Sequence, residues 1–372
     1  MYSSRVTPLS SADMTHPADS ETGAADLDLD LGPARAAAAR FVDIGELPCI
    51  VFGVIDASGR WSAQVVQGHD RSVEERSIFF LGSVTKAIVA TAVMQYIDEG
   101  RLDVDAPLAR YLPGFQGEGR ERVTAAHVLT HTSGLPDLSI ETLRSERPTY
   151  ERSLEFALAS TPRWEPGSAY EYNSAAWLLL SETMARLSGQ PFASALAHRL
   201  TVPLGMLDTS FDPRAQRERL VPVHGFRISN RLVQEVLLRF LVRARLPGGG
   251  MFGTLADMLR LGRAVLPPDA AASGPRVLSA AAIDEMTRNR TDGMTHLSED
   301  GVEREVRQGL GWRKPEADWP GSERAFTHGG ISGGRLWVDP GAGLAFAFLS
   351  NVWQAPLQPA IAVLEEVYRA KE

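Results

Sequence analysis

Strand-like segments lie at both ends of this 372-residue chain, and helical patterns fill the stretch between them. Near the start, residues 49–56 (CIVFGVID) and 61–68 (WSAQVVQG) are rich in β-forming residues and are separated by the turn sequence ASGR, as in a hairpin. Between the ends, apolar residues recur three and four apart, which is the period of a helix. The chain is therefore predicted to adopt an α/β (α+β) fold, with one antiparallel sheet built from both ends, flanking helices and an inserted, mostly helical lobe. Near the end of the chain, strands are predicted at residues 324–330, 334–339 and 344–351, and a final helix at 358–371.

These patterns divide the chain into three parts. Residues 1–32 carry six acidic residues and one basic residue, and we expect a disordered acidic tail because such a segment cannot bury enough apolar surface to become ordered. The alternation ADLDLDLG at residues 25–32 would suit a docking motif or an added strand, but a solvated linker is the preferred interpretation. Residues 33–100 together with 246–372 are predicted to form the sheet domain, and residues 101–245 the helical domain.

Composition and charge exclude several functions. A formal net charge of −8 without a dense basic cluster argues against a nucleic-acid partner. No run of 18 uncharged apolar residues is present, which argues against a membrane partner. The single cysteine, Cys49, lies in an apolar segment and is expected to be a buried strand residue. The histidines show no spacing typical of metal ligands, so neither a metal nor a cofactor is expected. The first residues lack the features of a secretory signal, which predicts a cytoplasmic protein.

The segment 79–100 (FFLGSVTKAIVATAVMQYIDEG) carries the main candidates for chemistry. A helix beginning near Ser83 and ending at Gly100 would place Ser83 and Lys86 on one face, with Ser83 in the first turn, where the helix dipole favours a developing negative charge. Because this helix is apolar nearly all round, Lys86 would be poorly solvated, which disfavours its charged form and makes it a usable base for the Ser83 hydroxyl. For this spacing alone, a helix-capping serine followed by a surface lysine is the commoner arrangement.

Five further segments accompany GSVTK in an order that resembles the serine β-lactamase and D-alanyl-D-alanine carboxypeptidase superfamily. The resemblance is to the branch that contains class C β-lactamases and family VIII esterases, and it covers roughly residues 34–372. The segments are VLTHTSGLPD (128–137), PGSAYEYNSAAWLLLSE (166–182), VPLGMLDTSF (202–211), GGGMFGTLADMLRLG (248–262) and FTHGGISGG (326–334).

That family has three catalytic elements: S-x-x-K, Y-x-N, and a strand that carries K-T-G or H-x-G. The resemblance implies that Ser83 is the acylated nucleophile and Lys86 its base. The sequence His328-Gly329-Gly330 matches the H-x-G form. By position, the backbone N–H groups of Ser83 and Ile331 would form an oxyanion hole, and the small residue Gly330 suits close approach of a substrate to the strand.

The second element departs from the family pattern, because it is Tyr172-Asn173-Ser174. Tyr172 can still relay a proton between the nucleophile and the leaving group. Ser174 cannot reproduce the two-ended hydrogen bonding of an asparagine amide. In the family that asparagine helps to hold the lysine and the amide of the substrate, so turnover of β-lactams or peptides is disfavoured. Tyr170 is expected to pack rather than react.

Three other features have competing interpretations. His131, in HTSGL, is expected to be a hydrogen-bonded structural histidine beneath the helical lobe. The motif G-x-S-x-G around Ser332 is not a nucleophile elbow, because a strand and not a helix follows it, and Ser332 is expected in the wall of the site. The stretch 226–250 is either a lid or pocket wall, with Leu237 and Phe240 favouring an apolar acyl group, or plain interdomain packing.

The leading hypothesis is a serine acyl-transfer enzyme that acts through an acyl-enzyme, most simply an esterase on small-molecule esters. A transacylase that forms an ester or amide in small-molecule biosynthesis is the alternative. A β-lactamase or D,D-peptidase ranks third, and a non-catalytic binding scaffold is the hypothesis from a different class. The expected partners are a small-molecule ester, amide or other acyl substrate and, for the transacylase, an amine or alcohol acceptor. No oligomeric state follows from the sequence.

Overall fold

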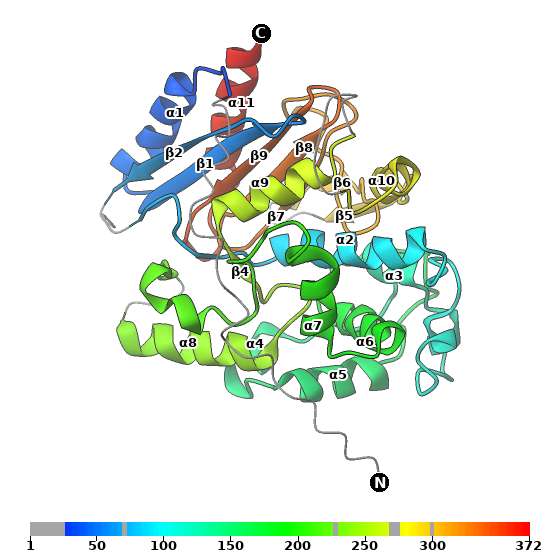
Figure 1. Ribbon diagram of the computed structural model, residues 1–372. Coiled ribbons are helices and arrows are strands. Elements are labelled where there is room, and N and C mark those ends of the chain that lie inside the picture. Colours follow the sequence, from blue (N-terminus) through cyan, green and yellow to red (C-terminus); the bar gives the residue numbers. More distant parts are fainter. Residues whose placement is uncertain (1–26, 69–72, 226–229, 268–275, 298–300) are drawn as a thin grey trace.

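A five-stranded antiparallel sheet, in the order β2-β1-β9-β8-β7, joins the two ends of the chain (Figure 1). The computed structural model describes residues 27–68, 73–225, 230–267, 276–297 and 301–372. Strand β1 pairs with β9 from Val51 opposite Leu349 to Asp56 opposite Leu344, which confirms the predicted sheet. The strands are β1 (Cys49–Asp56), β2 (Trp61–Gln67), β7 (Phe326–Gly329), β8 (Arg335–Asp339) and β9 (Leu344–Leu349).

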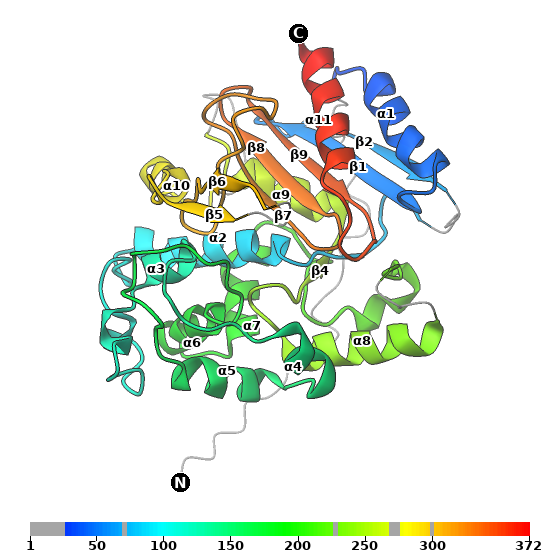
Figure 2. The same cartoon turned by 180° about the vertical axis from the view of Figure 1, so that it is seen from behind.

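Helices cover both faces of this sheet (Figures 1 and 2). Helix α9 (Leu255–Ala264) packs on one face, and α1 (Gly32–Asp43) and α11 (Gln358–Lys371) lie together on the other. The close approach of α9 depends on Gly262, because a Cβ atom there would lie 2.6 Å from the Cβ atom of Ala345 on β9. The predicted C-terminal helix is confirmed with the bounds expected for it.

Helix α2 (Val84–Asp98) lies between the sheet and the helical lobe (Figure 1). Thirteen of its residues are buried, so it has no solvated face, as expected for a helix that is apolar nearly all round. Gly100 follows it with φ +68°, a left-handed conformation that suits glycine at a helix end. The predicted helix is therefore confirmed, and its first turn begins at Ser83.

The helical lobe lies on the other side of α2 from the sheet (Figures 1 and 2). The domain boundaries at residues 100 and 246 stay predictions. The helices of the lobe are α3 (Ala125–Leu129), α4 (Ile140–Ser145), α5 (Tyr150–Ala159), α6 (Trp177–Ser188), α7 (Phe192–Leu196) and α8 (Arg231–Ala244). The remaining elements are β3 (Phe79–Phe80), β4 (Phe252–Gly253), β5 (Thr295–Leu297), β6 (Glu303–Glu305), α10 (Ala280–Thr287), 3₁₀ turns at Leu108–Arg110, Arg120–Arg122 and Arg214–Arg219, and a π turn at Ala197–Thr201.

The segment just before α1 contacts the sheet domain, which differs from the prediction of a disordered tail through residue 32. Leu31 is buried, and Leu27 and Leu29 pack against the same apolar cluster. Ser62 Oγ on β2 also donates a hydrogen bond to the carbonyl oxygen of Leu27 at 3.2 Å. The alternation of aspartate and leucine turns the leucines toward the core, and they therefore dock this segment onto the sheet domain. Residues 1–26 of the predicted tail lie outside the described residues.

Within the described ranges, no helix has the length and apolar character needed to cross a bilayer. Cys49 is fully buried on β1, as predicted, and its Sγ atom donates to Asn351 Oδ1 at 3.3 Å.

Candidate active site

Ser83 occupies the N-cap position of α2, but its side chain makes no capping hydrogen bond. Its Oγ atom instead accepts a hydrogen bond from Tyr172 Oη at 2.8 Å and lies 3.5 Å from Lys86 Nζ. Lys86 is fully buried, so a capping serine with a surface lysine does not describe this segment. The Ser83 hydroxyl is held between two groups that can donate and accept protons.

The buried ammonium group of Lys86 has an acceptor for each of its three N–H bonds. Nζ donates to Ser83 Oγ, to Ser174 Oγ at 3.0 Å and to the carbonyl oxygen of Gly248. It also lies 4.7 Å from the centre of the Tyr172 ring. Three acceptors and an aromatic face offset the cost of burying the cation, and they fix Nζ beside the nucleophile.

The Gly248 carbonyl is a site group that the sequence analysis missed. A backbone acceptor has no side-chain signature, and the only signal is the run Gly248-Gly249-Gly250. Glycine is needed there, because a Cβ atom on Gly248 would lie 2.8 Å from the carbonyl oxygen of Ser174. The glycine run lets the backbone pass close to Ser174, so that the carbonyl oxygen of Gly248 reaches Lys86 Nζ.

The second element places Ser174, and not Asn173, at Lys86. Asn173 is buried and points away: Nδ2 donates to the carbonyl oxygen of Leu135 at 2.7 Å, and Oδ1 accepts from the Ala176 N–H at 2.7 Å. Asp137, which the sequence analysis also missed, accepts from the Ser174 N–H at 3.0 Å. Asn173 therefore does not take over the role of the asparagine that the Y-x-N motif has at the position of Ser174.

His131 contacts Tyr172 and the residues on both sides of it. The two rings stack with centres 4.4 Å apart. The carbonyl oxygen of His131 accepts from the Glu171 N–H at 2.9 Å, and its Nδ1 atom accepts from the Asn173 N–H at 3.1 Å. His131 adopts φ +59°, a strained conformation for a residue other than glycine. The expected structural, hydrogen-bonded histidine is therefore present, and its contacts fix the tyrosine of the site.

Two histidines beside Lys86 are uncharged at neutral pH. Burial, and then the charge of Lys86, lower the pKa of His131 well below its usual range. The same two causes lower the pKa of His328 to about 3. His328 Nδ1 lies 2.9 Å from the carbonyl oxygen of Gly329. This contact assigns the proton of the neutral ring to Nδ1, since a carbonyl oxygen only accepts. The H-x-G histidine therefore brings no positive charge to the site.

The backbone N–H groups of Ser83 and Ile331 have no acceptor among the described residues. Their segments lie against each other, since a Cβ atom on Gly82 would be 3.0 Å from Ile331 N. A Cβ atom on Gly330 would be 2.2 Å from the carbonyl oxygen of Leu81. Glycine at both positions allows two unpartnered N–H groups to approach each other, the arrangement that an oxyanion hole requires.

These groups open into one pocket of about 290 Å³. Ser83 and Tyr172 line it together with His328, Gly330 and Ile331, so the structure brings the predicted site residues together, with Lys86 and Ser174 hydrogen-bonded behind them. Arg313, Trp319 and Arg335 line the same pocket and were not predicted.

Two further residues lie near the site without lining its pocket, Ser332 and Tyr170. Ser332 is fully buried, donates to the carbonyl oxygen of Phe80 and does not line the pocket, so its expected place in the site wall is wrong. Tyr170 packs against the rings of His131 and His296, as expected, and burial raises its pKa to about 12.

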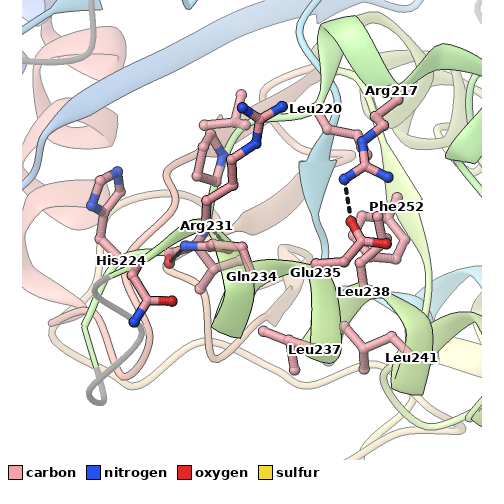
Figure 3. A pocket seen from close by; sticks show the side chains of 14 residues that line it. Arg217, Leu220, His224, Arg231, Gln234, Glu235, Leu237, Leu238, Leu241 and Phe252 are labelled. Atoms are coloured by element: carbon pink, nitrogen blue, oxygen red, sulfur yellow. Dashed lines mark hydrogen bonds and ion pairs between the residues drawn. The ribbon is translucent and has the colours of Figure 1, made fainter.

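Helix α8 forms the wall of a separate pocket of about 480 Å³ (Figure 3). Leu237 lines this pocket, and Phe240 packs in the adjoining apolar cluster. An ion pair between Arg217 and Glu235 lies at one side of it. None of the residues that line it also lines the Ser83 pocket. The predicted role of α8 toward an acyl group stays a prediction, and residues 226–229 of that stretch lie outside the described residues.

Comparison with known proteins agrees with this geometry. The sequence profile of the family described as Beta-lactamase matches residues 34–367. Penicillin-binding protein 4 of Amycolatopsis lactamdurans is 32% identical over 85% of this chain and 80% of its own length. Esterase EstB of Burkholderia gladioli is 29% identical over 76% of this chain and 79% of its own length. The crystal structure of a family VIII carboxylesterase superposes with a TM-score of 0.75 at 22% identity, over 91% of this chain and 96% of that chain.

The profile match covers nearly the whole described chain, and the sheet, the central helix and the pocket occupy the places that the resemblance implied. The chain is therefore an enzyme of the β-lactamase family of serine hydrolases.

Proposed function

We propose that this protein is an esterase on small-molecule esters, and that it works through an acyl-enzyme formed on Ser83. The observation that carries the proposal is the contact of one oxygen with two proton-transfer groups: Ser83 Oγ lies 2.8 Å from Tyr172 Oη and 3.5 Å from Lys86 Nζ. An adjacent base is what activates an otherwise weak serine nucleophile.

In the first half-reaction Ser83 Oγ forms a bond to the acyl carbon of the ester. Lys86, which acts as the base in its neutral amine form, takes the Ser83 proton while negative charge develops on the carbonyl oxygen. The N–H groups of Ser83 and Ile331 stabilise that oxyanion. The bond to the alkoxide then breaks, and Tyr172 gives the alkoxide a proton, so that an alcohol leaves and an acyl-serine remains.

In the second half-reaction water attacks the acyl-serine. Its proton passes to the Tyr172 phenolate, the bond between the acyl carbon and Ser83 breaks, and Ser83 recovers its proton from Lys86. The acid leaves and the starting enzyme is restored. Both half-reactions use the same three side chains in opposite directions.

The second element supports an ester rather than an amide or β-lactam substrate. Ser174 Oγ accepts from Lys86 at 3.0 Å, which provides one function of an asparagine side chain. A hydroxyl group cannot at the same time orient the amide of a substrate as a carboxamide can. An ester offers no N–H to orient and depends less on that group. Esterase EstB, one of the relatives, is itself described as an esterase.

A transacylase is the second candidate, and the exposure of Tyr172 favours it. This residue is 43% exposed although its hydroxyl contacts Ser83. An alcohol or amine can therefore approach the acyl-serine from solvent and be deprotonated by Tyr172 as water would be. The acceptor then leaves as an ester or amide.

The test combines active-site labelling with turnover of p-nitrophenyl esters. A fluorophosphonate should label wild-type protein at Ser83 and leave Ser83→Ala unlabelled, and Ser83→Ala should release no nitrophenol above background. Ser332→Ala is the matched control, because this serine lies near the site but does not line the pocket; its labelling should persist. Labelling of Ser83→Ala to the wild-type extent would refute the proposal. New ester or amide on addition of an alcohol or amine would select the transacylase.

A further inference from the structure

The pocket of about 480 Å³ along helix α8, called the α8 pocket below, takes no part in the proposed reaction (Figure 3). Its volume is typical of a site for a small molecule. No residue that lines it also lines the Ser83 pocket. The two pockets therefore have separate walls, and the α8 pocket needs a ligand of its own.

The wall that α8 gives to this pocket is apolar from residue 237 onward. Leu237, Leu238 and Leu241 line the pocket at positions i, i+1 and i+4, which share one face of a helix. Phe252 on β4 lines the same pocket, and it packs with all three leucines in one apolar cluster. Leu237 and Leu238 stay only half-buried, because the pocket lies in front of them. An apolar ligand there would complete their burial.

The first turn of α8 gives the same pocket a polar wall. Arg231 and His224 line it, and Figure 3 shows them on the left, with Leu241 on the right. Gln234 also lines it, but its side-chain amide already donates to the carbonyl oxygen of Val223 and accepts from the Val223 N–H. The rise of a helix separates Arg231 from Leu241 by about 15 Å along the axis. A straight-chain molecule of medium length can therefore contact both walls.

The charges around the α8 pocket leave one cation without a counter-charge. Glu235 lines the pocket, but it forms ion pairs with Arg217 and, at 2.8 Å, with Arg239. Arg231 pairs with no carboxylate among the residues that the structure describes. It also lies at the N-terminal end of α8, where the helix dipole adds a partial positive charge. The polar wall therefore favours an anionic group.

We propose that the α8 pocket is a second ligand site that binds a straight-chain carboxylic acid of medium length. The carboxylate pairs with the guanidinium group of Arg231, whose fork matches it with two parallel hydrogen bonds. The methylene chain lies along Leu237, Leu238 and Leu241, where each buried methylene group adds to the affinity. Such a chain can be a free acid or the acyl part of a substrate held at Ser83, and the separate walls favour the free acid.

The test titrates the protein with decanoate, and with decanol as its neutral counterpart, by isothermal titration calorimetry. Wild-type protein should bind one decanoate per chain. Arg231→Gln, at an exposed position, should weaken decanoate binding about 10-fold through loss of a charge-assisted hydrogen bond and leave decanol binding unchanged. Leu238→Trp should fill the pocket and weaken both ligands by more than about 10-fold. Leu232→Gln is the matched control, because this leucine is exposed on the same helix and does not line the pocket.

A second measurement separates the free acid from an acyl chain held at Ser83. Protein labelled at Ser83 by a fluorophosphonate should bind decanoate as tightly as unlabelled protein does. Loss of binding after labelling would place the chain in the Ser83 pocket and overturn the second site. Wild-type affinity for decanoate in Arg231→Gln or in Leu238→Trp, or no binding to the wild type, would also overturn it. The comparison of variants holds whether or not Ser83 reacts, so the site and the esterase function can fail independently.

Discussion

The ring of His131 stacks on the ring of Tyr172 with centres 4.4 Å apart and an interplanar angle of 29°. His131 also accepts hydrogen bonds from the backbone N–H groups of the two residues that flank Tyr172. The buried, neutral ring of His131 therefore fixes the plane of the phenol and the backbone at Asn173, and the backbone carbonyl of His131 fixes the backbone at Glu171. The 2.8 Å contact between Tyr172 and Ser83 depends on this support.

Replacing His131 should impair catalysis by displacing Tyr172. His131→Phe keeps a ring for stacking but loses the acceptor, and His131→Asn keeps an acceptor but loses the ring. Because small misplacements at a reacting centre can cost about 100-fold, we expect kcat to fall about 10- to 100-fold in each variant with a smaller change in KM. Steady-state kinetics on a neutral p-nitrophenyl ester measures this. Full kcat in both variants would show that Tyr172 needs no such support.

Ser174 should be required as an acceptor for Lys86. Ser174→Ala removes one of the three acceptors of a buried ammonium group, which should cost about 1–3 kcal/mol of unfolding free energy and lower kcat/KM about 10-fold or more. Ser174→Asn restores an acceptor and adds an amide donor, so ester turnover should survive while turnover of p-nitroanilides rises relative to it. Denaturant unfolding and parallel kinetics on both substrates check this. Wild-type activity in Ser174→Ala would contradict it.

The fold was predictable because its signals are local and repeated. The β-rich segments predicted at 49–56 and 344–351 pair as expected over residues 51–56 and 344–349, and the helix that begins after Ser83 is buried on all sides because it has no polar face. The leucines of residues 27–31 were misjudged. Their aspartate neighbours suggest solvation, whereas burial depends on a cluster formed with residues more than 300 positions away.

Close backbone packing at Gly330 should be essential for activity. A Cβ atom there would lie 2.2 Å from the carbonyl oxygen of Leu81, so Gly330→Ala must move Ile331 away from Ser83. Loss of one oxyanion-hole donor typically costs about 100- to 1,000-fold in kcat. Gly334→Ala is the matched control, since its added Cβ would meet only ordinary contacts at 3.5 Å or more. Similar kcat values in the two variants would argue against Ile331 as a donor.

The buried His328 should make stability depend on pH. The unfolded chain takes up a proton on this histidine below about pH 6.5, whereas the folded chain does so only near its pKa of about 3. The unfolding free energy should therefore fall as the pH drops below 6.5, by about 1.4 kcal/mol per pH unit from this group.

His328→Asn removes this contribution. Urea unfolding at pH 7.5 and pH 5.0 should show a loss on acidification that is about 2 kcal/mol smaller in the variant than in the wild type. Comparing the two proteins cancels the contributions of other groups, including Asp257, whose pKa burial raises to about 6. The same pH dependence in both proteins would contradict the account.

Within the site, the side chains at motif positions could be predicted from the sequence and their supporting groups could not. The spacings of the S-x-x-K and Y-x-N motifs identify Ser83, Lys86, Tyr172 and Ser174. The carbonyl of Gly248 has no residue signature, and Arg335 looks like an ordinary residue at the start of a strand. Its place in the pocket becomes visible only from its pairing with Gly329 across the sheet.

The central claim is that Ser83 is acylated during turnover, and intact-mass measurement tests it most directly. Wild-type protein and Ser83→Ala are mixed with a p-nitrophenyl ester, quenched in acid within the first turnovers and weighed. We predict that the wild type gains the mass of one acyl group, mapped to Ser83 by peptide digestion, and that Ser83→Ala gains none. Ester hydrolysis at the wild-type rate by Ser83→Ala, or an acyl group mapped to another residue, would contradict the account.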